Sequence, residues 1–334
     1  MERQAAGDAS ELRRELGERS RTWAQGRAHV ESYGQPGVIV FAPEDGRHGN
    51  FLEESYVAIA AQPEWFRRFD KIHSHGRALP RPTLCGSDGQ PRKWRELDSS
   101  MSSDALLMNI FCAPGVAQSA GVRGGLAVDV GWGGQDLPIF GWKARVPLAN
   151  GRVDRTEVDM RWGNLLVESK LTEADFQTRA AKVVEGYRDF DVVFDRDRLP
   201  RAEIRTARRR AAVEFAEEFT QEWEEPAADD SIAQGFQAGL VAQARQAEPA
   251  EPGYRGYQLI RNVLAAYATG ASFCVLHDAR RPDLREQWYD VMAAVKVAEM
   301  RVRCKVLTWQ ELAGLVPAGV EEFLRDKYGI SAAE

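Results

Sequence analysis

The sequence predicts an α/β protein, because segments with strand character alternate along the chain with segments of helical periodicity. Two observations carry this prediction. Two apolar strand-like segments near the middle of the chain are separated by a short polar turn, and a later helical segment is followed directly by an apolar strand. The length of 334 residues suits about two average domains, or a single α/β domain that carries insertions.

Four elements are expected in the N-terminal part of the chain. Residues 1–30 are rich in Arg, Glu, Ala and Gln, which favours a solvated helix, and residues 38–41 form a short apolar strand. The aromatic residues of segment 63–69 recur at helical spacing, and this pattern is more typical of core packing than of a ligand site. The serines that open segment Ser102–Phe111 predict a capped helix, which Pro114-Gly115 ends.

The C-terminal half continues the alternation of strands and helices. Thr172–Asp175 has the sequence of a capping box, and apolar residues recur at helical spacing from Phe176 to Tyr187, so a helix is expected there. A second capping box is expected at Thr308–Glu311. The remaining elements are a helix over Tyr257–Thr269, strands over Ser272–Asp278 and Val302–Leu307, and a last helix that ends at Tyr328-Gly329.

The charge pattern changes between these elements. Arg201–Arg210 has a local charge of +4 and Glu214–Asp230 a local charge of −8, and an apolar stripe of Phe215, Phe219 and Trp223 continues through the acidic part. We expect an amphipathic helical appendage there, outside the central sheet. The predicted division is an N-terminal extension over 1–95, a core formed by 96–189 and 257–334, and a helical and linker-rich insertion over 190–256.

The composition excludes several classes of protein. Apolar residues make up 44% and charged residues 28% of the chain, which excludes a collagen-like or wholly disordered protein. The formal net charge of −6 excludes a uniformly basic nucleic-acid binder, so such binding would need a local basic surface. No apolar run approaches the ~18 residues of a membrane span, and the charged N-terminus lacks the apolar segment of a signal peptide. The four scattered cysteines cannot form a zinc knuckle or a CxxC pair, so we expect a reduced, cytoplasmic protein.

A β-hairpin is predicted near the middle of the chain. Arg161–Asn164 is short and polar and contains Gly-Asn, and it separates the strand-like segments Val153–Met160 and Leu165–Leu171. We expect Met160 to lie opposite Leu165 across this turn.

In this register, four ionisable side chains share one face of the hairpin, because residues two apart on a strand point the same way. They are Glu157, Asp159, Glu168 and Lys170, with Glu157 opposite Glu168. The other face is expected to pack in the core and carries Val158, Met160, Leu165, Val167 and Leu171.

Three carboxylates on one face repel one another, and a hard divalent cation would remove that penalty. The ammonium group of Lys170 could orient an attacking water or offset charge in a phosphoryl transition state. The alternative from the residues alone is a solvated hairpin face, with Arg155 and Lys170 as salt-bridge partners.

Asp159, followed after a short hairpin by Glu168-Ser169-Lys170, resembles the D…(D/E)xK signature of the PD-(D/E)xK nuclease superfamily. The order of helix, three strands, helix and strand around it is similar to the core of that superfamily and implies a restriction-endonuclease-like mixed β-sheet flanked by helices. Ser102–Phe111 would be the first helix and Leu126–Val130, or a stretch near it, the first strand. Val158 stands where many members have a proline. Local strings that look like a bacterial restriction-endonuclease-like group are Ser102–Leu106, Glu168–Glu173, Tyr257–Asn262 and Lys327–Ile330.

The resemblance implies roles for individual residues. Asp159 and Glu168 would be metal ligands, the backbone carbonyl of Ser169 would complete the metal shell, and Lys170 would be the catalytic lysine, with Glu157 beside them. An acid from the first helix often joins such sites, and Glu96, Asp98 and Asp104 remain open as candidates. Gln258, Arg261 and Asn262 on a neighbouring helix would contact the substrate or make capping and core hydrogen bonds.

The expected function is hydrolysis of DNA phosphodiester bonds with Mg²⁺, or Mn²⁺ in its place. Two alternatives remain open: a non-cleaving nucleic-acid-binding or assembly module on the same fold, and a metal-dependent phosphohydrolase of small substrates. The expected partners are DNA and either a second copy of the chain or subunits of a defence system, and no membrane. Arg280, Arg281 and Arg285 would touch phosphates or form a solvated face, and His73 and His75 are expected to be surface polar residues.

Overall fold

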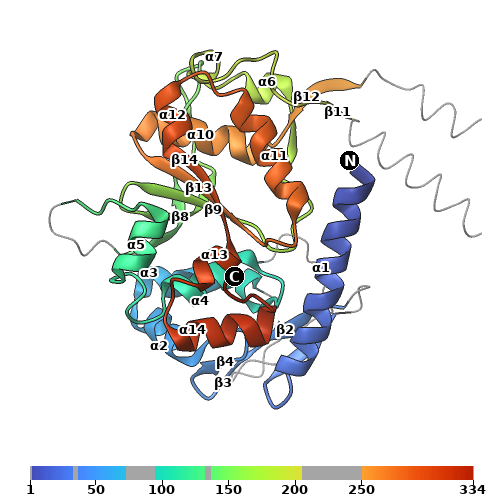
Figure 1. Ribbon diagram of the computed structural model, residues 1–334, viewed down its shortest axis with the longest axis vertical. Helices are drawn as coiled ribbons and strands as arrows, with labels where there is room; N and C mark the ends of the chain where they lie inside the picture. Colours follow the sequence, from blue (N-terminus) through green and yellow to red (C-terminus); the bar gives the residue numbers. More distant parts are fainter. Residues whose placement is uncertain (1, 33–36, 73–94, 132–136, 205–249, 334) are drawn as a thin grey trace, which may run out of the picture.

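The computed structural model describes residues 2–32, 37–72, 95–131, 137–204 and 250–333 (Figure 1). Its centre is a five-stranded sheet with the order β14-β13-β9-β8-β5. Pairs β5–β8 and β8–β9 are antiparallel, whereas β9–β13 and β13–β14 are parallel, so the predicted mixed sheet is confirmed. The strands are β5 (Ile139–Lys143), β8 (Glu157–Trp162), β9 (Leu165–Ser169), β13 (Ser272–His277) and β14 (Cys304–Thr308).

Helices cover both faces of this sheet, because β9 is apolar on both sides. Leu165 and Val167 pack into one core cluster and Leu166 into another. The first cluster also holds residues of α4, α13 and α14, and the second holds residues of α10 and α11, which lie on opposite sides of the sheet in Figure 1. These helices are α4 (Ser103–Phe111), α10 (Tyr257–Thr269), α11 (Pro282–Ala293), α13 (Trp309–Ala313) and α14 (Ala318–Phe323).

Several predicted elements are confirmed by their caps. The Ser102 hydroxyl accepts a hydrogen bond from Ala105 N at the start of α4. Helix α10 has the predicted bounds and ends at Gly270, whose φ of +67° suits the left-handed cap position. The capping box at Thr308 is present, since Thr308 and Glu311 each accept a hydrogen bond from the other's backbone N–H. The last turn ends at Gly329, as expected.

The first strand of the sheet was expected at residues 126–130 or in a stretch near them. Residues 126–130 do not form it, because helix α5 (Ala120–Leu126) ends at Leu126, and the strand is β5, which follows at Ile139. Helix α5 begins at Ala120 because the Ser119 hydroxyl accepts a hydrogen bond from Val122 N. The glycine-rich sequence of this segment obscured that capping signal.

The helix expected behind Thr172–Asp175 is also wrong. The carboxylate of Asp175, which would complete the capping box, accepts a hydrogen bond from Gln177 N instead, and the Thr172 hydroxyl donates to Met101 O. The following residues pair with a distant strand and form β10 (Thr178–Ala180), and only Ala181–Val184 is helical (α6). Long-range strand pairing has therefore overridden the local helical pattern.

Part of the predicted appendage can be described. Strands β10, β11 (Arg201–Ile204) and β12 (Glu251–Arg255) form a separate three-stranded antiparallel sheet of order β10-β12-β11. Residues 201–204 are thus a strand rather than part of a helix. Residues 205–249, with the expected apolar stripe of Phe215, Phe219 and Trp223, lie outside the described residues, as do His73 and His75.

The N-terminal residues share a core with the sheet. Helix α1 (Glu2–Trp23) buries Leu12 and Leu16 in the same cluster as α4, and Trp65 and Phe69 join it, as their helical spacing predicted. The elements here are β1 (His29–Glu31), β2 (Ile39–Phe41), β3 (Pro43–Glu44), β4 (Arg47–His48), α2 (Glu53–Ala61), α3 (Pro63–Phe66), η1 (Arg67–Asp70) and η2 (Glu96–Asp98). The remaining short elements are β6 (Val146–Pro147), β7 (Val153–Asp154), α7 (Phe190–Val193), α12 (Ala298–Arg303) and η3 (Leu324–Tyr328). The division into extension, core and insertion stays a prediction.

Candidate active site

The predicted hairpin forms, but with a tighter turn than expected. Trp162 lies opposite Leu165, and Met160 lies opposite Val167 rather than Leu165. Gly163 has φ +54°, and a Cβ at this position would overlap Asp129 O. Glycine is therefore the residue that suits the first position of this two-residue turn. The register is shifted by two residues from the predicted one, so Glu157 does not lie opposite Glu168 as expected.

The alternation along β8 is interrupted at Asp159. Met160 packs in the first core cluster, whereas Val158 packs in the second, so the expectation that both share one core face is wrong. Gly141, which lies between the partners of Met160 and Val158 on β5, has φ +64° and bends that strand at the same level.

Asp159 lies where strands β8 and β9 part. The backbone pairing of the two strands ends at Met160 and Val167. Beyond that point the side chain of Asp159 binds β9 instead, because its Oδ2 accepts hydrogen bonds from Ser169 N at 2.7 Å and from Ser169 Oγ at 3.0 Å. Asp159 is half-buried, and no hydrogen bond from the described residues reaches its second oxygen, Oδ1.

Glu168 and Lys170 form a buried ion pair at the end of β9. Lys170 Nζ donates to Glu168 Oε1 at 2.7 Å, and Asn262 Nδ2 donates to Glu168 Oε2 at 2.8 Å. The backbone of Lys170 is held from both sides, because its N–H donates to Leu276 O and its carbonyl accepts from Trp309 Nε1. Both side chains are therefore fixed by the sheet and by α10.

Burial and neighbouring charges shift the pKa values of this group. The pKa of Asp159 is held well above its usual value by burial, and further by the charges of Glu168 and Asp104. Burial alone would lower the pKa of Lys170, but the charges of Glu168, Glu173 and Asp159 raise it overall. Lys170 is thus an ammonium group at neutral pH.

Of the three acids near the first helix, the structure brings Asp104 to the site. Asp98 is paired with the buried ring of His48 at 3.0 Å, and Glu96 is paired with Lys71 at 2.8 Å. Asp104 lies in the first turn of α4, and its charge acts on Asp159.

The side chain of Glu157 is bound by an arginine that also binds Asp104 of α4. Its Oε2 accepts a hydrogen bond from Arg68 Nη1 at 3.0 Å, and the same guanidinium donates to Asp104. Arg68 belongs to the N-terminal part, and sequence reasoning missed it. It lies 36 and 89 positions from its two partners, and no periodic pattern in the sequence links it to them.

The residues predicted on the neighbouring helix hold the site together. Arg261 is buried and donates to Glu157 O at 2.7 Å and to Asn262 Oδ1 at 2.9 Å, while Asn262 orients Glu168. Gln258 lies one turn before Asn262 on α10, and its buried Oε1 has no hydrogen-bond partner in the described part of the chain. These contacts favour a positioning role for Arg261 and Asn262.

Two of the three arginines suggested as phosphate contacts, Arg280 and Arg281, are internally paired. Arg280 binds Asp278, Glu15 and the carbonyl of Tyr328. Arg281 is fully buried and binds Asp283. Neither forms the solvated face that was the alternative.

The described residues contain no group of three His, Cys, Asp or Glu side chains close enough to share a metal ion. Two carboxylates, Asp159 and Glu168, nevertheless fit a hard divalent cation, since Mg²⁺ commonly uses one or two carboxylates together with waters and substrate phosphate. Burial first, and the negative charges of Glu168 and Asp104 second, raise the pKa of Asp159, and a divalent cation would offset both effects by neutralising the carboxylates.

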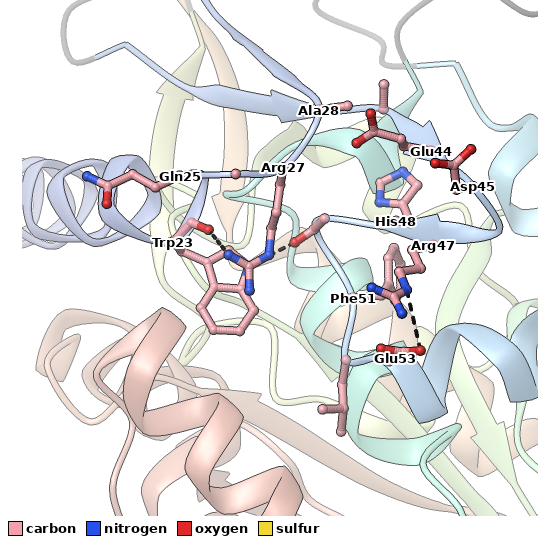
Figure 2. A pocket seen from close by; sticks show the side chains of 14 residues that line it. Trp23, Gln25, Arg27, Ala28, Glu44, Asp45, Arg47, His48, Phe51 and Glu53 are labelled. Atoms are coloured by element: carbon pink, nitrogen blue, oxygen red, sulfur yellow. Dashed lines mark hydrogen bonds and ion pairs between the residues drawn. The ribbon is translucent and has the colours of Figure 1, made fainter.

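Two cavities lie away from this group. The larger, about 810 Å³, is formed by the N-terminal elements, and Figure 2 shows Arg27 stacked over Trp23 on one side and the Arg47–Glu53 ion pair on the other. The smaller, about 460 Å³, is lined by residues that include Tyr187 and Tyr257. Neither is lined by Asp159, Glu168 or Lys170.

A mixed sheet flanked by helices, with an acidic residue on one strand of a hairpin and a Glu-x-Lys sequence on the other, defines a protein of the restriction-endonuclease-like class. The chain matches the family described as "Restriction Endonuclease associating with ARP" over residues 19–329, and it belongs to that family. Comparison with curated proteins and with solved structures finds no match. Within the described ranges, none of the helices combines the length and apolar character that crossing a membrane requires.

Proposed function

We propose that this protein is a metal-dependent deoxyribonuclease of the PD-(D/E)xK superfamily. The observation that supports this proposal best is that Asp159 of β8 is hydrogen-bonded to Ser169 of β9, which lies between the ion-paired Glu168 and Lys170. A solvated salt-bridge face would not bury Glu168 and Lys170 or hold Asp159 with two hydrogen bonds from Ser169.

Asp159 and Glu168 would hold Mg²⁺ or Mn²⁺, with the backbone carbonyl of Ser169 as a further ligand. The bound ion would polarise the scissile phosphate and lower the pKa of a bound water. Asn262 and Ser169 orient the carboxylate oxygens before metal or substrate arrives, so little reorganisation is needed on binding.

Lys170 would act as an ammonium group rather than as a general base. Its pKa is raised, so it stays protonated, and its positive charge would stabilise the negative charge that develops on the phosphoryl oxygens in the transition state. Glu157 and Asp104 would complete the acidic surroundings, with Glu157 held by Arg68.

DNA is proposed as the substrate because the chain belongs to a restriction-endonuclease family. The test is cleavage of plasmid DNA, linear DNA and RNA by the purified protein with Mg²⁺, with Mn²⁺ and with EDTA. We expect metal-dependent cleavage of DNA that Lys170→Ala abolishes. The matched control is Lys182→Ala, because Lys182 is an exposed lysine paired with Glu251.

Three results would contradict the proposal. Cleavage in EDTA, or full activity of Lys170→Ala, would remove the assigned site. DNA binding without cleavage under all metal conditions would favour the non-cleaving module, and a second copy or other subunits would then be sought as the partner that completes it.

A further inference from the structure

Arg68 reaches from the N-terminal part of the chain into the acidic surroundings of the site. Its side chain is only 10% exposed and lies between two carboxylates: Nη2 is 2.5 Å from Asp104 Oδ2, and Nη1 is 3.0 Å from Glu157 Oε2. One organic cation therefore bridges an acid of α4 and an acid of β8.

The attraction to these carboxylates is what holds the guanidinium. Its third nitrogen, Nε, is buried and makes no hydrogen bond within the described residues. Lys71 is paired with Glu96, with Nζ 2.8 Å from Oε2, and it lies farther from the two carboxylates, at 3.5 Å from Asp104 and 3.9 Å from Glu157. A buried guanidinium that leaves a donor unused indicates a position selected for charge rather than for complete hydrogen bonding.

The sheet makes room for this cation. Gly141 of β5 has φ +64°, and a Cβ there would overlap the Arg68 guanidinium, coming within 2.7 Å of Cζ, and would approach Glu157 Oε2 to 3.2 Å. A side chain at this position would fill the space that the guanidinium uses.

Glu157 lies two residues before Asp159 on β8, and Arg68 links Glu157 to Asp104, so the Asp104–Glu157 pair lies next to the proposed metal ligands. A pair of carboxylates beside a metal site is itself a suitable ligand set for a second divalent ion, as in two-metal phosphodiesterases. In this protein a guanidinium stands between them.

We propose that Arg68 occupies the position of a second cation between Asp104 and Glu157, so that the site binds one divalent ion and not two. This inference rests on the proposed function for the first ion, at Asp159 and Glu168. Arg68 is on this view a positioning residue: it neutralises Asp104 and Glu157 and excludes metal from them.

The test is calorimetric titration of the full-length protein with Mn²⁺ in the absence of DNA, with bound metal counted by elemental analysis. Wild type should bind one ion, Arg68→Met two, and the double variant Arg68→Met/Asp104→Asn one again. Arg68→Lys keeps a positive charge and should bind one. The matched control is Arg67→Met, because Arg67 is the exposed neighbour that pairs with Glu64.

Failure of this inference and failure of the proposed function give different results. One ion in both wild type and Arg68→Met, or two ions in wild type, would overturn the role of Arg68 and leave the proposed function standing. No ion in wild type but one in Arg68→Met would support the role of Arg68 and overturn the ligand assignment at Asp159 and Glu168. No ion in either protein would overturn both.

Removal of a buried cation can also unfold the protein. If Arg68→Met is unfolded without metal, Mn²⁺ should restore its melting transition and should not restore that of Arg68→Met/Asp104→Asn. Restoration in both variants, or in neither, would overturn the inference.

Discussion

The side-chain amide of Asn262 donates a hydrogen bond of 2.8 Å to Glu168 Oε2, and it thereby joins helix α10 to the end of strand β9. The other oxygen of Glu168 is bound by Lys170 at 2.7 Å, so both carboxylate oxygens are engaged. Asn262 is in turn fixed by the buried guanidinium of Arg261. The orientation of the Glu168 carboxylate therefore depends on a helix that lies nearly a hundred residues later in the chain.

The first prediction concerns Asn262. Asn262→Ala should lower the free energy of unfolding by about 1.5–3 kcal/mol, because a hydrogen bond to a buried charged group is lost. It should also lower the cleavage rate more than it weakens DNA binding, since Glu168 loses its orientation. Urea unfolding and kinetics check this, with the turn residue Asn150→Ala as the control. Unchanged stability and unchanged cleavage would contradict the positioning role.

The second prediction concerns the ion pair of Lys170 and Glu168. Lys170→Met should destabilise the protein by about 3–5 kcal/mol, because it leaves a buried carboxylate without its partner. The double variant Lys170→Met/Glu168→Gln should recover much of this loss, since the uncompensated charge is gone, while cleavage stays abolished. A double-mutant cycle by urea unfolding measures the coupling, and strictly additive effects would contradict a direct pair.

The third prediction concerns the pH dependence caused by Asp159. Burial, then the charges of Glu168 and Asp104, raise the pKa of this carboxyl in the folded state. Its stabilising contribution is fully present below the unfolded pKa of about 4 and is lost as the pH rises through the folded pKa. In EDTA, Asp159→Asn should therefore gain in melting temperature relative to wild type as the pH rises from about 4.

Mg²⁺ should remove this difference, because it stabilises the ionised form of wild type and binds the amide variant poorly. Melting curves between pH 4 and pH 8, with EDTA and with Mg²⁺, test both statements. The control is Asp197→Asn at an almost fully exposed position. Parallel pH profiles of wild type and Asp159→Asn in EDTA would show that the pKa of Asp159 is not raised in the folded protein.

The fourth prediction concerns Lys327, which is buried far from the site. Its Nζ contacts both Asn50 oxygens and the Tyr328 hydroxyl, and among the described residues it has no carboxylate partner. Burial first, and the charge of Arg27 second, lower its pKa well below the usual value.

A lysine whose folded pKa is lowered contributes more stability as the pH rises toward its unfolded pKa of about 10.4, because only the unfolded chain binds the proton in that range. Wild type should therefore gain stability relative to Lys327→Met between about pH 7 and pH 10. Urea unfolding across this range measures the gain, and Lys182→Met serves as the exposed control. A difference that does not change with pH would mean that Lys327 is charged in the folded protein.

Much of the architecture was readable from local patterns. The helix Tyr257–Thr269, the strand after it and the capping box at Thr308 form as predicted, because each depends on neighbouring residues: a period of 3.6, a run of apolar residues or a cap. The hairpin that brings Asp159 near the Glu168–Lys170 segment was also predicted, since a hairpin joins segments that are close in sequence, but the predicted register placed Glu157 opposite Glu168.

The errors lie where distant segments compete with local preference. Residues 178–180 pair with residues 253–255 instead of continuing a helix, and the register of the hairpin follows a two-residue turn that pattern alone did not select. The choice of Asp104 over Glu96 and Asp98 depended on the packing of α4 against β9, because all three acids are paired, Asp104 with Arg68, Glu96 with Lys71 and Asp98 with His48.

The sequence by itself determined the α/β class, the order of most elements around the hairpin and the residues of the hairpin that carry the candidate chemistry. Only the tertiary structure decided that Arg68 bridges Asp104 and Glu157, that Asn262 orients Glu168 and that Arg281 is buried. The physical reason is that periodicity and capping encode backbone hydrogen bonds and the face a side chain takes, within one element at a time. The partner of a buried charge is set by how elements from different parts of the chain pack, and no local sequence pattern identifies that partner.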